Sequence, residues 1–273
     1  MSEFTAELVG TFLLILLGGS VNANVKLKQT TGHGSDWILT TIGWGAAVAI
    51  AIYSVVAYSG AHLNPAVTLG MASIGELEPQ KIVSYIAGQF CGAILGAIAV
   101  WLAFLPHWEA TEDTQAKLGV FSTGPAIDRP LSNLVTEGIG TFALVFGVLA
   151  IFSPEALTQA QDDLGGAENA EALQQEWAYG IKPLLVGLLV LVIGMGLGGP
   201  TGYAINPARD LGPRIAHALL PIAGKGDSNW SYAWIPVLGP IIGGIAAAFT
   251  CLLYTSDAAD DMQCVDLGGR RII

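Results

Sequence analysis

Six apolar runs of about 17 to 23 residues dominate the sequence. A helix rising about 1.5 Å per residue needs this length to cross a hydrocarbon core of ~30 Å. The runs cover residues 4–21, 38–59, 82–104, 134–152, 183–199 and 233–254. Only 12% of the 273 residues are charged, against roughly 25% in soluble globular domains. The sequence therefore predicts an all-α, multi-pass integral membrane protein with six transmembrane helices.

The first residues of the chain form an apolar run, whereas the last residues do not. The first run lacks the basic leading segment and the Ala-x-Ala exit of a cleavable signal peptide, so we expect it to remain as the first helix. Residues 255–273 break from the apolar pattern and look like translated sequencing-adapter read-through rather than a native terminus. We assign this tail no function and expect one domain over residues 1–254.

The two halves of that domain repeat each other. The sequence ELVGTF at residues 7–12 matches EGIGTF at 137–142, and GAHLNPA at 60–66 matches GYAINPA at 202–208. The offset is 130 residues for the first pair and 142 for the second, so twelve extra residues lie between them. The simplest place for these residues is the acidic segment 154–180, which is expected to be a solvated loop. The repeats span about residues 1–105 and 131–254.

Each repeat contains three spans, with Asn-Pro-Ala between the second and the third. Two tandem repeats with an odd number of spans enter the membrane in opposite orientations, as in inverted-repeat transport proteins. The two Asn-Pro-Ala segments are therefore expected to approach each other from opposite faces of the membrane.

Asn-Pro-Ala is a helix start. Asn64 and Asn206 suit the N-cap, and Pro65 and Pro207 suit the first helical position. The helices predicted at residues 65–74 and 207–217 are ~15 Å long, half a bilayer. The sequence thus adds two re-entrant half-helices to the six spans.

Irregular backbone at membrane depth must be buried in protein or line a watery cavity. This rule applies to residues 60–63 and 202–205, which precede the half-helices. Their carbonyl groups are expected to line a pore, namely those of Gly60, Ala61, His62, Leu63, Gly202 and Ala204. At the centre, the amide NH2 groups of Asn64 and Asn206 would donate to a passing oxygen. The positive ends of two helix dipoles would disfavour cations and protons there.

With these motifs the sequence resembles the major intrinsic protein family of aquaporins and glycerol facilitators. SGAHLNPAV at residues 59–67 and NPARD at 206–210 resemble the aquaglyceroporin branch, and the resemblance covers about residues 1–254. It implies an inverted three-helix repeat and a homotetramer in the cell membrane, with one pore per subunit. It implies neither a cofactor nor a metal nor a nucleic-acid partner.

The resemblance also implies an outer constriction formed by Trp44, Gly194, Tyr203 and Arg209. Arg209 would donate hydrogen bonds to hydroxyl groups and repel cations. Trp44 and Tyr203 would form an apolar corner for a carbon backbone. Gly194 would leave room where water-selective relatives place a histidine. Tyr203 departs from the phenylalanine usual in this branch, which leaves open glycerol, smaller diols, dihydroxyacetone and protonated lactic acid.

Two buried acids and one histidine accompany the motifs. Intramembrane acids can form a proton relay. The resemblance instead implies that Glu7 and Glu137 accept hydrogen bonds from the loops that carry Asn-Pro-Ala. We expect His62 to buttress its loop rather than to sense pH.

These observations predict a passive channel for glycerol and similar small uncharged solutes, with water, that excludes ions and protons. A water-selective channel, a coupled small-solute transporter and a structural junction protein are the alternatives. An enzyme is not expected, because no nucleophile, base and orienting group recur at a plausible spacing and no metal cluster is visible.

Overall fold

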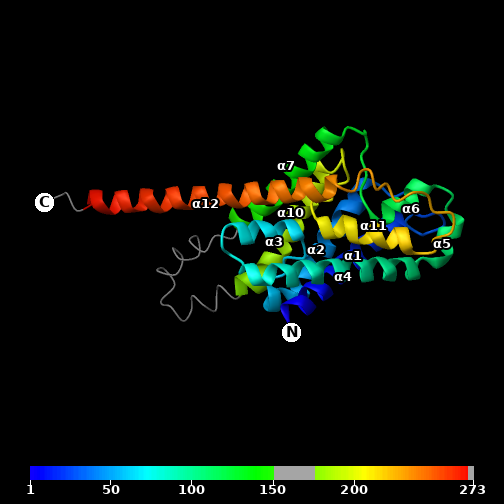
Figure 1. Cartoon of the computed structure of the whole chain (residues 1–273), viewed down its shortest axis with the longest axis horizontal. Coiled ribbons are helices and arrows are strands. Elements are labelled where there is room, and N and C mark those ends of the chain that lie inside the picture. Colours follow the sequence, from blue (N-terminus) through cyan, green and yellow to red (C-terminus); the bar gives the residue numbers. More distant parts are fainter. Residues whose placement is uncertain (151–175, 270–273) are drawn as a thin grey trace.

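The computed structural model describes residues 1–150 and 176–269, with side chains described as far as Leu253. Within this part the chain is helical and contains no strand (Figure 1). Six helical segments are long and apolar enough to span a membrane. They are α1 (Glu3–Lys26), α2 (Trp37–Ser59), α4 (Pro79–Ala103), α7 (Pro130–Ala150), α10 (Lys182–Leu197) with the preceding π-helical turn η1 (Trp177–Ile181), and α12 (Ile235–Gly269). The predicted fold class is confirmed.

The fifth span begins earlier than predicted. Its helix starts within the expected loop 154–180, because the apolar residues of η1 continue the helix. The hydroxyl of Tyr53 on α2 donates to the carbonyl of Gly180 at 2.5 Å and ties this turn to the bundle. The remainder of the predicted loop, up to residue 175, lies outside the described residues.

At the other end, the apolar part of α12 finishes at Leu253, close to the predicted limit of the domain. The backbone helix continues into the tail to Gly269 and extends away from the bundle (Figure 1). Residues 270–273 lie outside the described part of the chain.

Four shorter helices complete the described fold. The half-helices α3 (Pro65–Ser73) and α11 (Pro207–Leu219) differ from their predicted ends by one and two residues. The helices α5 (Leu105–Ala110) and α6 (Thr114–Phe121) lie in the connection between the repeats and were not predicted. The side chain of Asp113 begins α6 by accepting from the backbone N–H groups of Gln115 and Ala116. The connection thus has helical structure of its own beside α11.

The first and third helices of each repeat pack closely through glycine. A Cβ on Gly92 of α4 would overlap the carbonyl oxygen of Leu8 on α1. A Cβ on Gly243 of α12 would overlap the carbonyl oxygen of Gly138 on α7. Lipid gives helices little hydrophobic reason to associate, so close backbone contact through small residues holds such pairs together.

Candidate functional site

Each half-helix begins at a buried asparagine whose side chain caps it. Asn64 caps α3 by accepting from the backbone N–H of Ala66 at 2.9 Å. Asn206 caps α11 by accepting from Ala208 at 3.0 Å and Arg209 at 3.1 Å. Each side-chain oxygen thus satisfies N–H groups that lack a partner within the helix.

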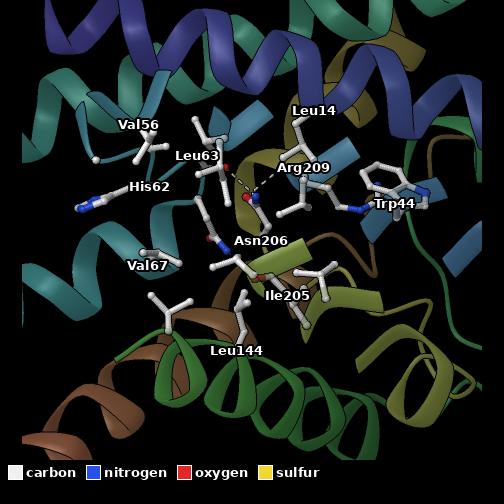
Figure 2. Close-up of a pocket in the computed structure, with 18 of the residues that line it drawn as sticks. Leu14, Trp44, Val56, His62, Leu63, Val67, Leu144, Ile205, Asn206 and Arg209 are labelled. Atoms are coloured by element: carbon white, nitrogen blue, oxygen red, sulfur yellow. Dashed lines mark hydrogen bonds between the residues drawn. The ribbon is translucent and has the colours of Figure 1, made fainter. Parts of the chain in front are cut away.

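The side-chain amide of each asparagine reaches across to the opposite loop. Asn64 Nδ2 donates to the carbonyl of Ile205 at 2.8 Å. Asn206 Nδ2 donates to the carbonyl of Leu63 at 2.8 Å (Figure 2). An NH2 group carries two hydrogens, so each asparagine retains a second donor. The carbonyl of Leu63, predicted to face the pore, also takes part in this closure.

The loops before the half-helices share an unusual backbone. The φ angles of Gly60, Ala61 and Leu63 are 73°, 55° and 51°. At positions 142 residues later, Gly202, Tyr203 and Ile205 have φ angles of 83°, 40° and 44°. Positive φ is uncommon outside glycine, and it persists where the surrounding structure imposes it. A buried carboxylate contacts each of these loops.

The first carboxylate belongs to Glu7 on α1, which is completely buried. It accepts from the backbone N–H groups of His62 at 3.0 Å and Leu63 at 2.7 Å. It also accepts from the Ser59 hydroxyl at 2.6 Å and the Gln89 amide at 2.7 Å. These bonds fix residues 60–63 to α1 and α4, the geometry that a supporting residue requires.

The second carboxylate belongs to Glu137 on α7, which is 1% exposed. It accepts from the backbone N–H groups of Ala204 at 3.0 Å and Ile205 at 2.8 Å. Each loop is therefore held by a buried carboxylate.

His62 belongs to the first loop. Its Nδ1 lies 3.2 Å from the Thr68 hydroxyl, and its ring centroid lies 4.8 Å from that of Tyr85.

Two cavities meet at one ring of residues. The central cavity has a volume of about 240 Å³ and is lined by both asparagines. Five of the residues whose carbonyl groups were expected to line a pore also line it, namely Gly60, Ala61, His62, Leu63 and Ala204. The vestibule, of about 660 Å³, is lined by Gly202 and by residues of α1, α2 and α6. The described linings share only Trp44, Tyr203 and Arg209. These three side chains therefore lie where the two cavities adjoin.

The central cavity has an apolar wall interrupted by polar groups. Figure 2 shows Leu14, Val56, Val67 and Leu144 around the position where Asn206 projects. A small solute with hydroxyl groups on a carbon chain matches such a surface, because polar contacts fix orientation and apolar contacts fill the remaining space.

Arg209 and Trp44 contact each other where the two cavities adjoin. The guanidinium carbon lies 3.9 Å from the centroid of the Trp44 ring, a cation–π contact. Arg209 Nη1 also donates to the carbonyl of Phe121 at 3.4 Å. The arginine is 6% exposed, so a nearly buried positive charge stands where the two cavities join.

Gly194, predicted to leave room at the constriction, lies behind the Tyr203 ring. It lines neither cavity, and a Cβ added to it would lie 2.7 Å from Cζ of Tyr203. The space left by the missing side chain is therefore filled by the tyrosine ring. This ring also contacts Trp37 edge to face at 5.7 Å. Within the described part of the chain, the buried Tyr203 hydroxyl has no hydrogen-bond partner.

A buried ion pair anchors α11 on the vestibule side. Asp210 accepts from Arg214 Nη2 at 2.7 Å, and neither side chain is exposed. Asp210 also accepts from the backbone N–H and the hydroxyl of Thr123. Arg214 donates to the carbonyls of Thr123 and Ser228. The pair thus joins the half-helix to two connecting segments.

Asn22 was not predicted as a site residue. It follows the first predicted span directly and is 5% exposed. It contacts both Trp44 and the backbone of α6. The available signal in the sequence was a polar residue one helical turn after Gly18, at the end of an apolar run.

Comparison with known proteins agrees with this geometry. A family model described as Major intrinsic protein matches residues 1–251. The chain belongs to the major intrinsic protein family. It is 54% identical to the Probable glycerol uptake facilitator protein of Thermotoga maritima, over 91% of this chain and 97% of the relative. It is 51% identical to the Glycerol uptake facilitator protein of Bacillus subtilis, over 89% of this chain and 81% of the relative.

A solved structure has a similar fold. The aquaglyceroporin from Plasmodium falciparum is 29% identical and superposes with a TM-score of 0.71, covering 90% of this chain and 93% of that one. The predicted family and its aquaglyceroporin branch are confirmed. As a member of the major intrinsic protein family with six membrane-length helices, the protein is a multi-pass channel of the cell membrane.

Proposed function

We propose that this channel conducts glycerol and similar small uncharged solutes, with water, down their concentration gradients and excludes ions and protons. The observation that carries the proposal is the constriction of Trp44, Tyr203 and Arg209 between the two cavities. Its two kinds of surface, aromatic and cationic, match the two faces of a polyol. The relatives named glycerol uptake facilitators support the same solute.

Passage through the pore is an exchange of hydrogen bonds and involves no covalent step. A polyol that leaves water loses hydrogen bonds from its hydroxyl groups, and Arg209 can donate replacements at the constriction. The carbon backbone of the solute meets the Trp44 and Tyr203 rings. Beyond the constriction, the free hydrogens of Asn64 and Asn206 offer the next donors. Because each contact resembles those in water, the solute is held weakly enough to leave again.

Cations and protons encounter positive potential at two successive places. The first is the fixed charge of Arg209, which burial leaves poorly screened. The second is the meeting point of the N-termini of α3 and α11, where both helix dipoles present their positive ends. The asparagine amides there donate and so favour a neutral oxygen over a hydronium ion.

Stopped-flow light scattering of proteoliposomes tests the proposal. Vesicles placed in a glycerol gradient should shrink and then re-swell faster than empty vesicles, as glycerol and water enter. Re-swelling no faster than in empty vesicles, together with fast shrinkage, would instead indicate a water-selective channel. Fast shrinkage and fast re-swelling that depend on a proton or sodium gradient would indicate a coupled transporter.

We also infer that four copies assemble, each with its own pore, as the family resemblance implies. The outward faces of the spans expose large apolar residues such as Val83, Leu131 and Val192, which suit contact with lipid or with a neighbouring subunit. Native mass spectrometry of the purified channel should give four times the monomer mass. A monomer retaining full glycerol flux would contradict this part of the proposal.

A further inference from the structure

Asn22 lies at the edge of the constriction, between α1, α2 and α6. Its side-chain oxygen Oδ1 accepts from the indole nitrogen Nε1 of Trp44 at 3.0 Å. Its amide nitrogen Nδ2 donates to the carbonyl of Gly119 on α6 at 3.2 Å. The reversed amide would place N–H against N–H and oxygen against oxygen, so the two partners determine its orientation.

The Trp44 ring is held on three sides. A Cβ on Gly18, one helical turn before Asn22 on α1, would lie 2.5 Å from the ring carbons Cε3 and Cζ3, so the indole rests directly on the helix backbone. Arg209 lies over the ring, as Figure 2 shows. Asn22 holds the remaining polar atom. The tryptophan is 4% exposed in this arrangement.

An indole has one hydrogen-bond donor and no acceptor. Because Asn22 occupies that donor, Trp44 has no N–H left for a solute and presents carbon to the constriction. Without Asn22, the buried N–H would lack a partner, and rotation of the ring toward the pore would allow it to bond to water or to a solute. Rotation would also remove the surface against which the Arg209 guanidinium is stacked.

We propose that Asn22 is a positioning residue that sets the solute selectivity of the channel by fixing the Trp44 indole with its N–H bonded to the Asn22 side chain. The inference rests on the proposed polyol conduction. It adds a determinant of selectivity on α1, outside the predicted ring of Trp44, Gly194, Tyr203 and Arg209. Asn22 acts through Trp44 and through the position that Trp44 gives Arg209.

The test compares solute ratios in proteoliposomes, because a ratio does not depend on the number of folded channels. In Asn22→Leu, which has a similar volume and neither hydrogen bond, the permeability ratio of erythritol to glycerol should rise roughly fivefold, the factor that about 1 kcal/mol gives at 25 °C. In Asn22→Asp, which keeps an acceptor for the indole, the ratio should stay near that of the wild type. If the leucine variant fails to insert, Asn22→Met tests the same loss with a side chain that adapts to irregular space.

A second background separates positioning from general packing. Trp44→Phe has no N–H, so adding Asn22→Leu to it should leave the erythritol to glycerol ratio of Trp44→Phe unchanged. A similar rise in both backgrounds would overturn the proposal, as would an unchanged ratio in Asn22→Leu. Asn24→Leu is the matched control, since Asn24 on the same helix accepts from the backbone N–H of Gly32 and has no bond to Trp44. Absence of glycerol flux through the wild-type channel would refute the proposed function instead.

Discussion

The two half-helices follow loops of the same backbone conformation, but the helices differ in the charge that they carry. Residues 60–66 and 202–208 have matching positive φ angles, matching asparagine caps and a carboxylate behind each loop. The helix α3 carries no charged residue, whereas α11 carries Arg209, Asp210 and Arg214. At the positions 142 residues earlier stand Val67, Thr68 and Ala72.

This difference teaches that the two half-helices repeat the backbone of the loops and the caps, whereas the charged side chains belong to the second half-helix alone. Both loops are needed to close the centre, because each asparagine donates to the carbonyl of the other loop. Charge is costly in a membrane and is retained where it has a function. In α11, Arg209 lies over the Trp44 ring where the two cavities adjoin, and Asp210 and Arg214 form a buried ion pair. In α3 the corresponding side chains are neutral, and Val67 lines the central cavity.

Removing the anchor of α11 should give the largest effect. Asp210→Ala leaves Arg214 buried without its partner, so we expect a loss of about 3–5 kcal/mol in the free energy of unfolding. Thr68→Ala, at the matching position of α3, removes neutral hydrogen bonds to Asn64 and Gln89 and should cost about 1 kcal/mol. Thermal or denaturant unfolding in detergent measures both, and equal losses would contradict the asymmetry.

Making the second half resemble the first at the constriction should weaken cation exclusion. Arg209→Val places the residue found at position 67 and removes the fixed charge. Two unit charges 4 Å apart interact by about 4 kcal/mol at an effective dielectric constant of 20, and the helix dipoles remain, so we expect proton leak to rise by at least ~tenfold. A pH-sensitive dye inside proteoliposomes reports the leak. Arg209→Lys keeps the charge, so its proton leak should stay at the wild-type level. A raised leak in the lysine variant would show that the shape of the arginine, rather than its charge, excludes protons.

Filling the space at Gly194, which the Tyr203 ring occupies, should have a smaller effect on glycerol flux, and a second substitution should reverse it. In Gly194→Ala the new methyl group overlaps the tyrosine ring and displaces it toward the pore, since overpacking costs about 1–3 kcal/mol. Glycerol flux should fall roughly fivefold, as expected for about 1 kcal/mol. Adding Tyr203→Ala, which introduces the residue found at position 61, should restore the flux. Stopped-flow re-swelling measures both, and a flux that stays low in the double variant would show that Gly194 acts elsewhere.

The smallest effect is expected from the tyrosine hydroxyl alone. Because no described residue bonds to this buried group, Tyr203→Phe removes an unsatisfied polar atom and should stabilise the protein by up to about 1 kcal/mol. Glycerol flux should be equal or higher. Loss of stability in a melting experiment would reveal a partner for the hydroxyl, such as bound water.

The half-helices show how much could be predicted from the sequence. Asn64-Pro65-Ala66 and its copy at residue 206 determine where a helix starts by local capping chemistry, and the predicted ends of α3 and α11 differ from the structure by one and two residues. The six spans follow from the length of apolar runs. The boundary of the fifth span was wrong because the apolar residues of η1 continue a helix where the acidic segment suggested a loop.

By itself the sequence determined the spans, the inverted repeat and the two helix starts, because each depends on neighbouring residues along the chain. Only the tertiary structure decided that Tyr203 fills the space at Gly194, that each asparagine bonds to the opposite loop, and that Asn22 holds Trp44. These contacts join residues far apart in sequence. Their geometry is set by how closely the helices pack, which no local pattern of residues records.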